Sequence, residues 1–153
     1  MKSYRDVIVI ACVSLLLLAV TGCHTVHPAR VADPTKLKDK KHLHVVQSTG
    51  KERGFHKEIV RNLTARGFIV ASGKLEAMDA KAELYLSCED RWTWDMVMYP
   101  WEVKMALHDA RTRELLGSSH FKNTFFHTYP DPPEITDELL GRIFGEPEGR
   151  YMK

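Results

Sequence analysis

The chain has no excess of charge of one sign. Its 153 residues carry 22 basic and 20 acidic side chains, which give a formal net charge of +2. A nucleic-acid-binding domain is expected to show a basic stripe or a strongly basic composition. The balance of charges therefore predicts that this protein has no nucleic-acid partner.

The chain also lacks the short motifs of common enzymes. Its serines stand outside any Gly-x-Ser-x-Gly sequence, and its glycines are isolated instead of grouped into a phosphate-binding or dinucleotide-binding loop. Glu89 and Asp90 are adjacent in an extended segment, so their carboxylates face opposite sides and cannot act as a pair. We expect no enzymatic activity and no cofactor.

Long hydrophobic runs are absent except for one, from Val7 to Val20. Lys2 and Arg5 precede it, and a basic start followed by a short apolar run is typical of a secretory signal. A membrane-spanning helix needs about 20 apolar residues, more than this run supplies. Residues 1–22 are therefore predicted to be a signal peptide.

The end of this run, Val20-Thr21-Gly22-Cys23, resembles a bacterial lipobox at all four positions. The resemblance implies cleavage between Gly22 and Cys23, and a diacylglycerol with further acylation on Cys23. Two or more acyl chains anchor a protein stably, whereas one chain anchors it only marginally. The next residue is His24 and not the Asp of an inner-membrane retention signal. We therefore expect a lipoprotein at the periplasmic face of the outer membrane of a Gram-negative bacterium.

Cysteine is scarce, since the chain has three. Cys12 lies in the predicted signal and Cys23 is the predicted lipidation site, so Cys88 would remain alone in the mature protein. An intramolecular disulfide is then excluded. Free cysteine most often packs as a small buried apolar side chain, and this is the expectation for Cys88.

The mature chain divides into three predicted parts. Residues 23–41 contain two prolines, many charges and few large apolar side chains, so we expect a lipidated N-terminus and a flexible tether. Residues 42–145 form a single domain, and residues 146–153 form a loose tail.

Two segments of the domain have the apolar spacing of a helix. The first follows a capping box at residues 49–52 and ends at Arg66-Gly67. Its apolar face consists of Phe55, Ile59, Val60 and Leu63. The second starts at Asp131-Pro132-Pro133-Glu134, where Asp caps and proline takes the first helical position, and it ends at Gly145. Its apolar face consists of Ile135, Leu139, Leu140, Ile143 and Phe144.

Extended segments are predicted at residues 42–47 and 68–70, from residue 82 onward, at 101–107 after a break at Tyr99-Pro100, and at 115–121. The order strand-helix-strand-strand-strand-strand-helix predicts an α/β two-layer sandwich. It has a mixed sheet of about five strands with both helices on one face. Arg113 stands where hairpin loops favour glycine, and a positive φ there would cost about 1 kcal/mol. Asp90 falls on the apolar side of its strand, so it marks a bulge or has a polar partner.

Aromatic and methionine side chains concentrate in one stretch: Trp92, Trp94, Met96, Val97, Met98, Tyr99 and Trp101. The alternation of the strand favours burial of Trp92 and Trp94 beneath the helices. The consecutive residues 96–99 cannot all face inward on a period of two, so some apolar surface should be exposed near a strand turn. Such surfaces are typical of protein-binding or weak self-association sites, and we take the six aromatic and methionine residues as candidates.

The sequence Trp92-Thr93-Trp94-Asp95, with Tyr99 and the hairpin at residues 109–116, resembles small Gram-negative lipoproteins. Their soluble part looks like the N-terminal α/β module of TolB. The likeness covers about residues 42–145. It implies an accessory or scaffold role in the cell envelope and no catalytic residues. Family hairpins have a glycine at the position of Arg113.

The main functional hypothesis is a lipid-anchored accessory or scaffold protein that binds a protein partner through the aromatic strand turn. The alternative is a carrier of a lipid or another apolar ligand in a groove between helices and sheet. Metal handling is a third hypothesis, because His42 and His44 share a strand face and His24 and His27 lie nearby in the chain. Structural zinc normally takes four ligands, and this set lacks the cysteines, so we expect no metal site.

Overall fold

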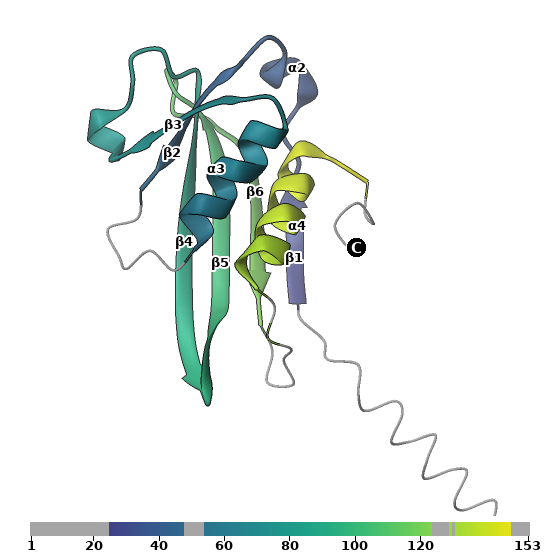
Figure 1. Cartoon of the computed structure of the whole chain (residues 1–153). Helices are drawn as coiled ribbons and strands as arrows, with labels where there is room; N and C mark the ends of the chain where they lie inside the picture. Colours follow the sequence, from purple (N-terminus) through teal and green to yellow (C-terminus); the bar gives the residue numbers. More distant parts are fainter. Residues whose placement is uncertain (1–24, 48–53, 124–128, 130, 148–153) are drawn as a thin grey trace, which may run out of the picture.

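The computed structural model describes residues 25–47, 54–123, 129 and 131–147. These residues form one mixed sheet of six strands in the order β1-β6-β5-β4-β2-β3, with two main helices packed on one face (Figure 1). The predicted two-layer α/β arrangement is confirmed, with one strand more than the approximate count of five.

The elements have the following bounds. The strands are β1 (Thr25–Arg30), β2 (His42–Val46), β3 (Ile69–Gly73), β4 (Leu84–Asp95), β5 (Val97–Asp109) and β6 (Leu115–Lys122). The helices are α2 (Pro34–Leu37), α3 (Phe55–Ala65) and α4 (Pro132–Phe144), with a short 3-10 helix η1 (Leu75–Ala77). Strand β2 runs parallel to β3 and β4, and the other neighbouring strands are antiparallel.

Local signals set the ends of α4 as predicted. The Asp131 side chain caps the helix by accepting a hydrogen bond of 3.1 Å from the backbone N–H of Glu134, and Gly145 ends it with φ of 68°. Helix α3 begins later than predicted, at Phe55 after Gly54, whose φ of 98° suits a glycine. The predicted capping box at residues 49–52 lies outside the described residues.

The core lies between the helices and one face of the sheet. It contains side chains from alternate positions of the central strands and from the apolar faces of α3 and α4. Its fully buried members include Leu43, Leu84, Leu86, Met105, Leu107, Ile59, Leu63, Ile135, Leu139 and Ile143. Full burial of each such side chain contributes about 1.5–3 kcal/mol. Cys88 packs against this core, and burial raises the pKa of its thiol to about 12.

The segment predicted to be a flexible tether is built into the fold. Strand β1 pairs with β6, and beyond it Ala32 is fully buried and donates a backbone hydrogen bond of 2.8 Å to the carbonyl of Ile143. An edge strand needs few apolar side chains, because backbone pairing supplies its contacts, and it tolerates Pro28. Counting apolar residues therefore missed this strand.

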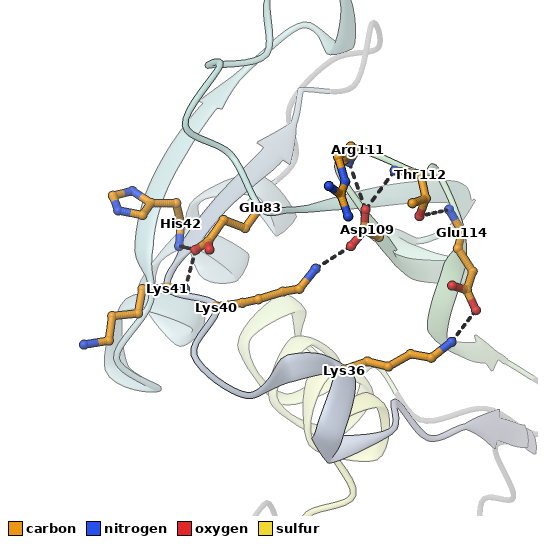
Figure 2. Close-up of polar contacts among 9 residues, drawn as sticks. All are labelled: Lys36, Lys40, Lys41, His42, Glu83, Asp109, Arg111, Thr112 and Glu114. Carbon is orange, nitrogen blue, oxygen red and sulfur yellow. Dashed lines mark hydrogen bonds and ion pairs between the residues drawn. The ribbon is translucent and has the colours of Figure 1, made fainter.

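Ion pairs hold the next stretch of the same segment against the β5–β6 hairpin (Figure 2). Lys36 in α2 pairs with Glu114 at 2.6 Å, and Lys40 pairs with Asp109. The hydrogen bonds from Lys40 and from the backbone N–H of Thr112 hold the pKa of Asp109 well below its usual range. The carboxylate of Asp109 therefore stays ionised over the whole physiological range.

A third carboxylate holds the start of β2. The Glu83 side chain accepts hydrogen bonds from the backbone N–H groups of Lys41 at 2.7 Å and His42 at 3.0 Å (Figure 2). These two bonds lower the pKa of Glu83. The chain from α2 to β2 is thus fixed to the domain at several points.

The first residue of the predicted loose tail, Glu146, is bound to the domain instead of being loose. Glu146 accepts from the guanidinium of Arg66 at 3.0 and 3.1 Å, and Arg66 also pairs with Asp137 of α4 at 3.1 Å. Residues 148–153 lie outside the described part of the chain.

Strands β4 and β5 form one long hairpin. The break predicted at Tyr99-Pro100 is wrong, because β5 continues through these residues to a turn at Met96. Both alternatives considered for Asp90, a polar partner and a bulge, apply. Its carboxylate accepts a hydrogen bond of 2.5 Å from the indole N–H of Trp92, and the ladder is irregular immediately after Arg91.

Candidate functional site

The candidate site is the end of the β4–β5 hairpin, which projects beyond the rest of the sheet (Figure 1). It projects because, among the described residues, β2 pairs with β4 at residues 84–86 alone and the ladder between β6 and β5 begins at Glu102. Four apolar side chains are exposed there: Trp94 by 69%, Met96 by 82%, Val97 by 50% and Met98 by 45%. We call these four residues the hairpin tip.

The turn geometry explains why these side chains are outside. Trp94 lies opposite Met98 and Asp95 opposite Val97, so Met96 occupies the turn itself with φ of 59°. A non-glycine residue in this left-handed conformation costs about 1–2 kcal/mol. The helices pack against other parts of the sheet, and no described element covers the tip.

The other candidate residues of the aromatic segment lie closer to the core. Trp92 is half-buried and packs edge-on against Phe55, the first residue of α3, with ring centroids 5.9 Å apart. Trp101 is also half-buried. The structure thus separates Trp92 and Trp101 from the exposed tip.

One expectation for this segment is wrong. Trp94 is not buried beneath the helices, because α3 begins at the level of Trp92 and Trp94 lies beyond it. Tyr99, another candidate docking residue, is buried with 5% of its surface accessible, and its ring packs edge-on against Tyr129 at 5.2 Å. Burial raises the pKa of Tyr99, with a contribution from Asp95. Tyr129 was missed, because it lies outside any periodic pattern and meets Tyr99 only in the folded chain.

Gly22 and Cys23, the predicted cleavage and lipidation residues, lie outside the described residues. Lipidation therefore stays a prediction. Among the described residues, no helix combines the length and the apolar character needed to cross a membrane.

A polar cluster on the helix-free face of the sheet was not predicted as a site. The nearly buried Glu102 accepts from His120 Nε2 at 2.9 Å and from Arg91 at 3.2 Å, and Lys104 lies at 3.3 Å. Burial favours a higher pKa for Glu102, but the hydrogen bonds from Arg91, Lys104 and His120 outweigh it and lower the pKa to about 2. The signal available in the sequence was the alternation of Glu102 and Lys104 with the core residues of β5.

This cluster is suited to holding the sheet together and not to acid–base chemistry at neutral pH. A carboxylate with two cationic neighbours, Arg91 and Lys104, and a hydrogen bond from His120 stays ionised. A general base works best with a pKa near the working pH. The ring of His120 stacks on His27 at 4.3 Å, and burial lowers the pKa of His120 against the opposing effect of Glu102.

The histidines considered for metal binding are dispersed. His44 is buried with its Nε2 3.2 Å from the carbonyl oxygen of Gly73, and His27 stacks on His120. His24 lies outside the described residues. No group of three or more histidine, cysteine or carboxylate side chains within the described ranges could hold a metal ion.

No protein-family model matches the chain, and no curated protein matches it in sequence. The chain is structurally similar to the PelC dodecamer from Paraburkholderia phytofirmans, with 13% identity over 79% of this chain and 95% of the PelC chain. The TM-scores are 0.52 for a single-substitution variant and 0.50 for a second crystal form. The similarity to TolB from Acinetobacter baumannii is weaker, with a TM-score of 0.46, 13% identity, and coverage of 80% of this chain and 32% of TolB. At these identities the likeness concerns the fold alone.

Proposed function

We propose that the chain is a lipid-anchored accessory or scaffold protein at the periplasmic face of a Gram-negative outer membrane, without enzymatic activity. It docks on another component of the envelope through the hairpin tip, and a protein is the component that the sequence favours. The single observation that carries this proposal is the exposure of Trp94, Met96, Val97 and Met98 on a projecting hairpin. Tryptophan and methionine are enriched at interfaces, and contiguous exposed apolar residues are typical of docking surfaces.

Two further observations support the proposal. The lipobox-like sequence at residues 20–23 supplies the anchor. The PelC structures, which share the fold, are dodecamers, so a second copy of this chain is one protein candidate for the partner.

The carrier alternative has no observation in its favour. Side chains from α3, α4 and the sheet fill the space between the helices and the sheet. Trp94, Met96 and Met98 lie at the hairpin end and not along a groove.

The anchor is tested by labelling growing cells with palmitate. The full chain should incorporate the label, and the Cys23→Ser variant should not. A wild-type chain that stays unlabelled would contradict the lipid anchor.

Docking is tested by placing a photoreactive side chain at position 96 of the full chain in cells. The matched control is position 69, because Ile69 is also exposed but lies at the opposite end of the sheet. Irradiation should give covalent adducts, with protein or lipid, from position 96 and none above background from position 69. Equal yields at the two positions would contradict docking through the tip.

A further inference from the structure

The chain enters the sheet at the same end as the hairpin tip. Thr25, the first residue of β1, lies opposite Lys122 of β6, and Lys122 lies opposite Glu102 of β5. Glu102 in turn lies opposite Arg91 of β4, from which β4 continues to the tip. In Figure 1 the start of β1 and the β4–β5 turn both lie at the lower end of the sheet.

Chain length limits how far the predicted lipid can lie from this end. Two residue steps separate Cys23 from Thr25, so Cys23 lies at most about 7 Å from the start of β1. From Arg91, which is level with Thr25, β4 extends roughly 16 Å to Met96 at about 3.3 Å per residue. The tip therefore reaches roughly 10 Å farther along the strand direction than Cys23 can.

This difference matches the depth of the lipid interface. The acylated cysteine is held at the headgroups, and apolar groups of interfacial proteins bury about 5–10 Å into the boundary between headgroups and acyl chains. The chemistry of the tip also fits, because tryptophan favours the interface and methionine is flexible and apolar. Asp95 beside Met96 favours a shallow position, since a carboxylate stays in the hydrated layer.

We propose that the hairpin tip inserts into the boundary between the headgroups and the acyl chains of the same membrane that holds Cys23. The component on which the tip docks is then the lipid surface itself. This inference rests on the lipid anchor of the proposed function, and it replaces a protein with the bilayer as the occupant of the tip. The domain contacts the membrane at two places, the acylated N-terminus and the tip, so its orientation on the bilayer is fixed.

The test uses the full lipidated protein, reconstituted into vesicles of phosphatidylethanolamine and phosphatidylglycerol with and without brominated phosphatidylcholine. Bromine on the acyl chains quenches tryptophan that reaches them. The wild type should lose roughly one third of its tryptophan emission, the share of one tryptophan among three. The Trp94→Phe variant should lose almost none, because Trp92 packs against the core and Trp101 is half-buried.

The matched control adds Ile69→Trp to the Trp94→Phe variant. It restores the number of tryptophans but places the new one at the end of the sheet away from Thr25, where quenching should be absent. Equal quenching in the wild type and in Trp94→Phe would overturn the inference. Circular dichroism checks that each variant is folded.

The outcomes separate this inference from the proposed function. Protein adducts from position 96 in cells, without quenching in pure lipid, would overturn the inference and leave the proposed docking in place. Failure of both experiments would overturn both.

Discussion

A methyl group added at Gly117 tests whether the N-terminal segment packs across β6. A Cβ at this position would lie 3.0 Å from Cγ2 of Ile143, 3.1 Å from the carbonyl oxygen of Arg30 and 3.2 Å from Cβ of Ala32. Each distance is shorter than an ordinary van der Waals contact. The three atoms belong to α4, to the end of β1 and to the residues after it, so relief would require movement of more than one element.

The cost of Gly117→Ala follows from these contacts. Overpacking of a core typically costs about 1–3 kcal/mol. Replacing glycine with alanine also lowers the conformational entropy of the unfolded chain, which stabilises the folded state by about 0.4–1 kcal/mol. The free energy of unfolding should therefore fall by about 1–2 kcal/mol. With a urea dependence of about 2 kcal/mol per molar, the middle of the usual range, the unfolding midpoint should fall by roughly 0.5–1 M.

The assay is equilibrium urea unfolding followed by tryptophan fluorescence, with Gly73→Ala as the control. A Cβ at Gly73 would meet its nearest atom, Cε1 of His44, at an ordinary 3.6 Å. The control should leave the midpoint unchanged or raise it slightly. If Gly117→Ala is as stable as the wild type, Arg30 and Ala32 do not lie against β6, and the reasoning that makes residues 25–41 part of the fold is refuted.

Three further predictions follow from the site and its surroundings. The pKa of Glu102 lies below its ordinary 4.5, so its ionised form adds stability above pH 4.5 that is lost as the pH falls towards 2. Glu102→Gln should lower the free energy of unfolding at neutral pH and should reduce its decrease at acidic pH, as urea titrations at several pH values would show. The same pH dependence in the variant and the wild type would contradict this prediction. Cys88, with a pKa raised to about 12, should react with iodoacetamide far more slowly in the native protein than in urea, as mass spectrometry would show. Replacing Met96 and Met98 with serine should change the free energy of unfolding by less than about 0.5 kcal/mol, because both are exposed, while reducing the quenching by brominated lipid.

Features of the fold that depend on local chemistry could be predicted from the sequence. The N-terminal cap of α4 at Asp131 and its end at Gly145 were predicted from side chains that satisfy nearby backbone groups. Arg113 stands at a hairpin position that favours glycine, and its φ of 63° is the positive value that the sequence analysis considered there. The guanidinium of Arg113 lies 5.1 Å from the centre of the Tyr85 ring, a contact that the sequence did not indicate and that offsets part of the strain.

Features that depend on distant partners could not be predicted. Strand β1 has a tether-like composition and is a strand only because β6 offers it an edge. The proline at position 100 indicated a break, because it lacks a backbone N–H. The structure accommodates Pro100 because the ladder between β6 and β5 begins at Glu102, so β4 is the one strand among the described residues that pairs with β5 at Pro100.

The same distinction between features set by neighbouring residues and features set by distant parts of the chain applies to the candidate site. Exposure of part of the run from Met96 to Tyr99 followed from the period of a strand, which cannot turn consecutive residues all inward. That Met96, Val97 and Met98 are all exposed while Tyr99 is buried did not follow from it. Trp94 could not be assigned by the same argument. Trp94 is two residues from Trp92 and faces the same side of the sheet. Trp92 is covered and Trp94 is not because of where α3 lies over the sheet, which the sequence does not indicate.

The pairing of β1 with β6 changes what an acyl anchor on Cys23 does to the domain. A flexible segment up to residue 41 would let the domain take any orientation, and an apolar tip would meet the membrane only by chance. With the strand beginning at Thr25, the start of β1 and the hairpin tip lie at one end of the sheet. The ion pairs of Lys36 and Lys40 with the β5–β6 hairpin (Figure 2) lie at the opposite end, because Asp109 pairs with Leu84 at the start of β4. In the proposed orientation, a protein partner that approaches from the side away from the membrane would therefore meet a charged surface before it met the apolar one.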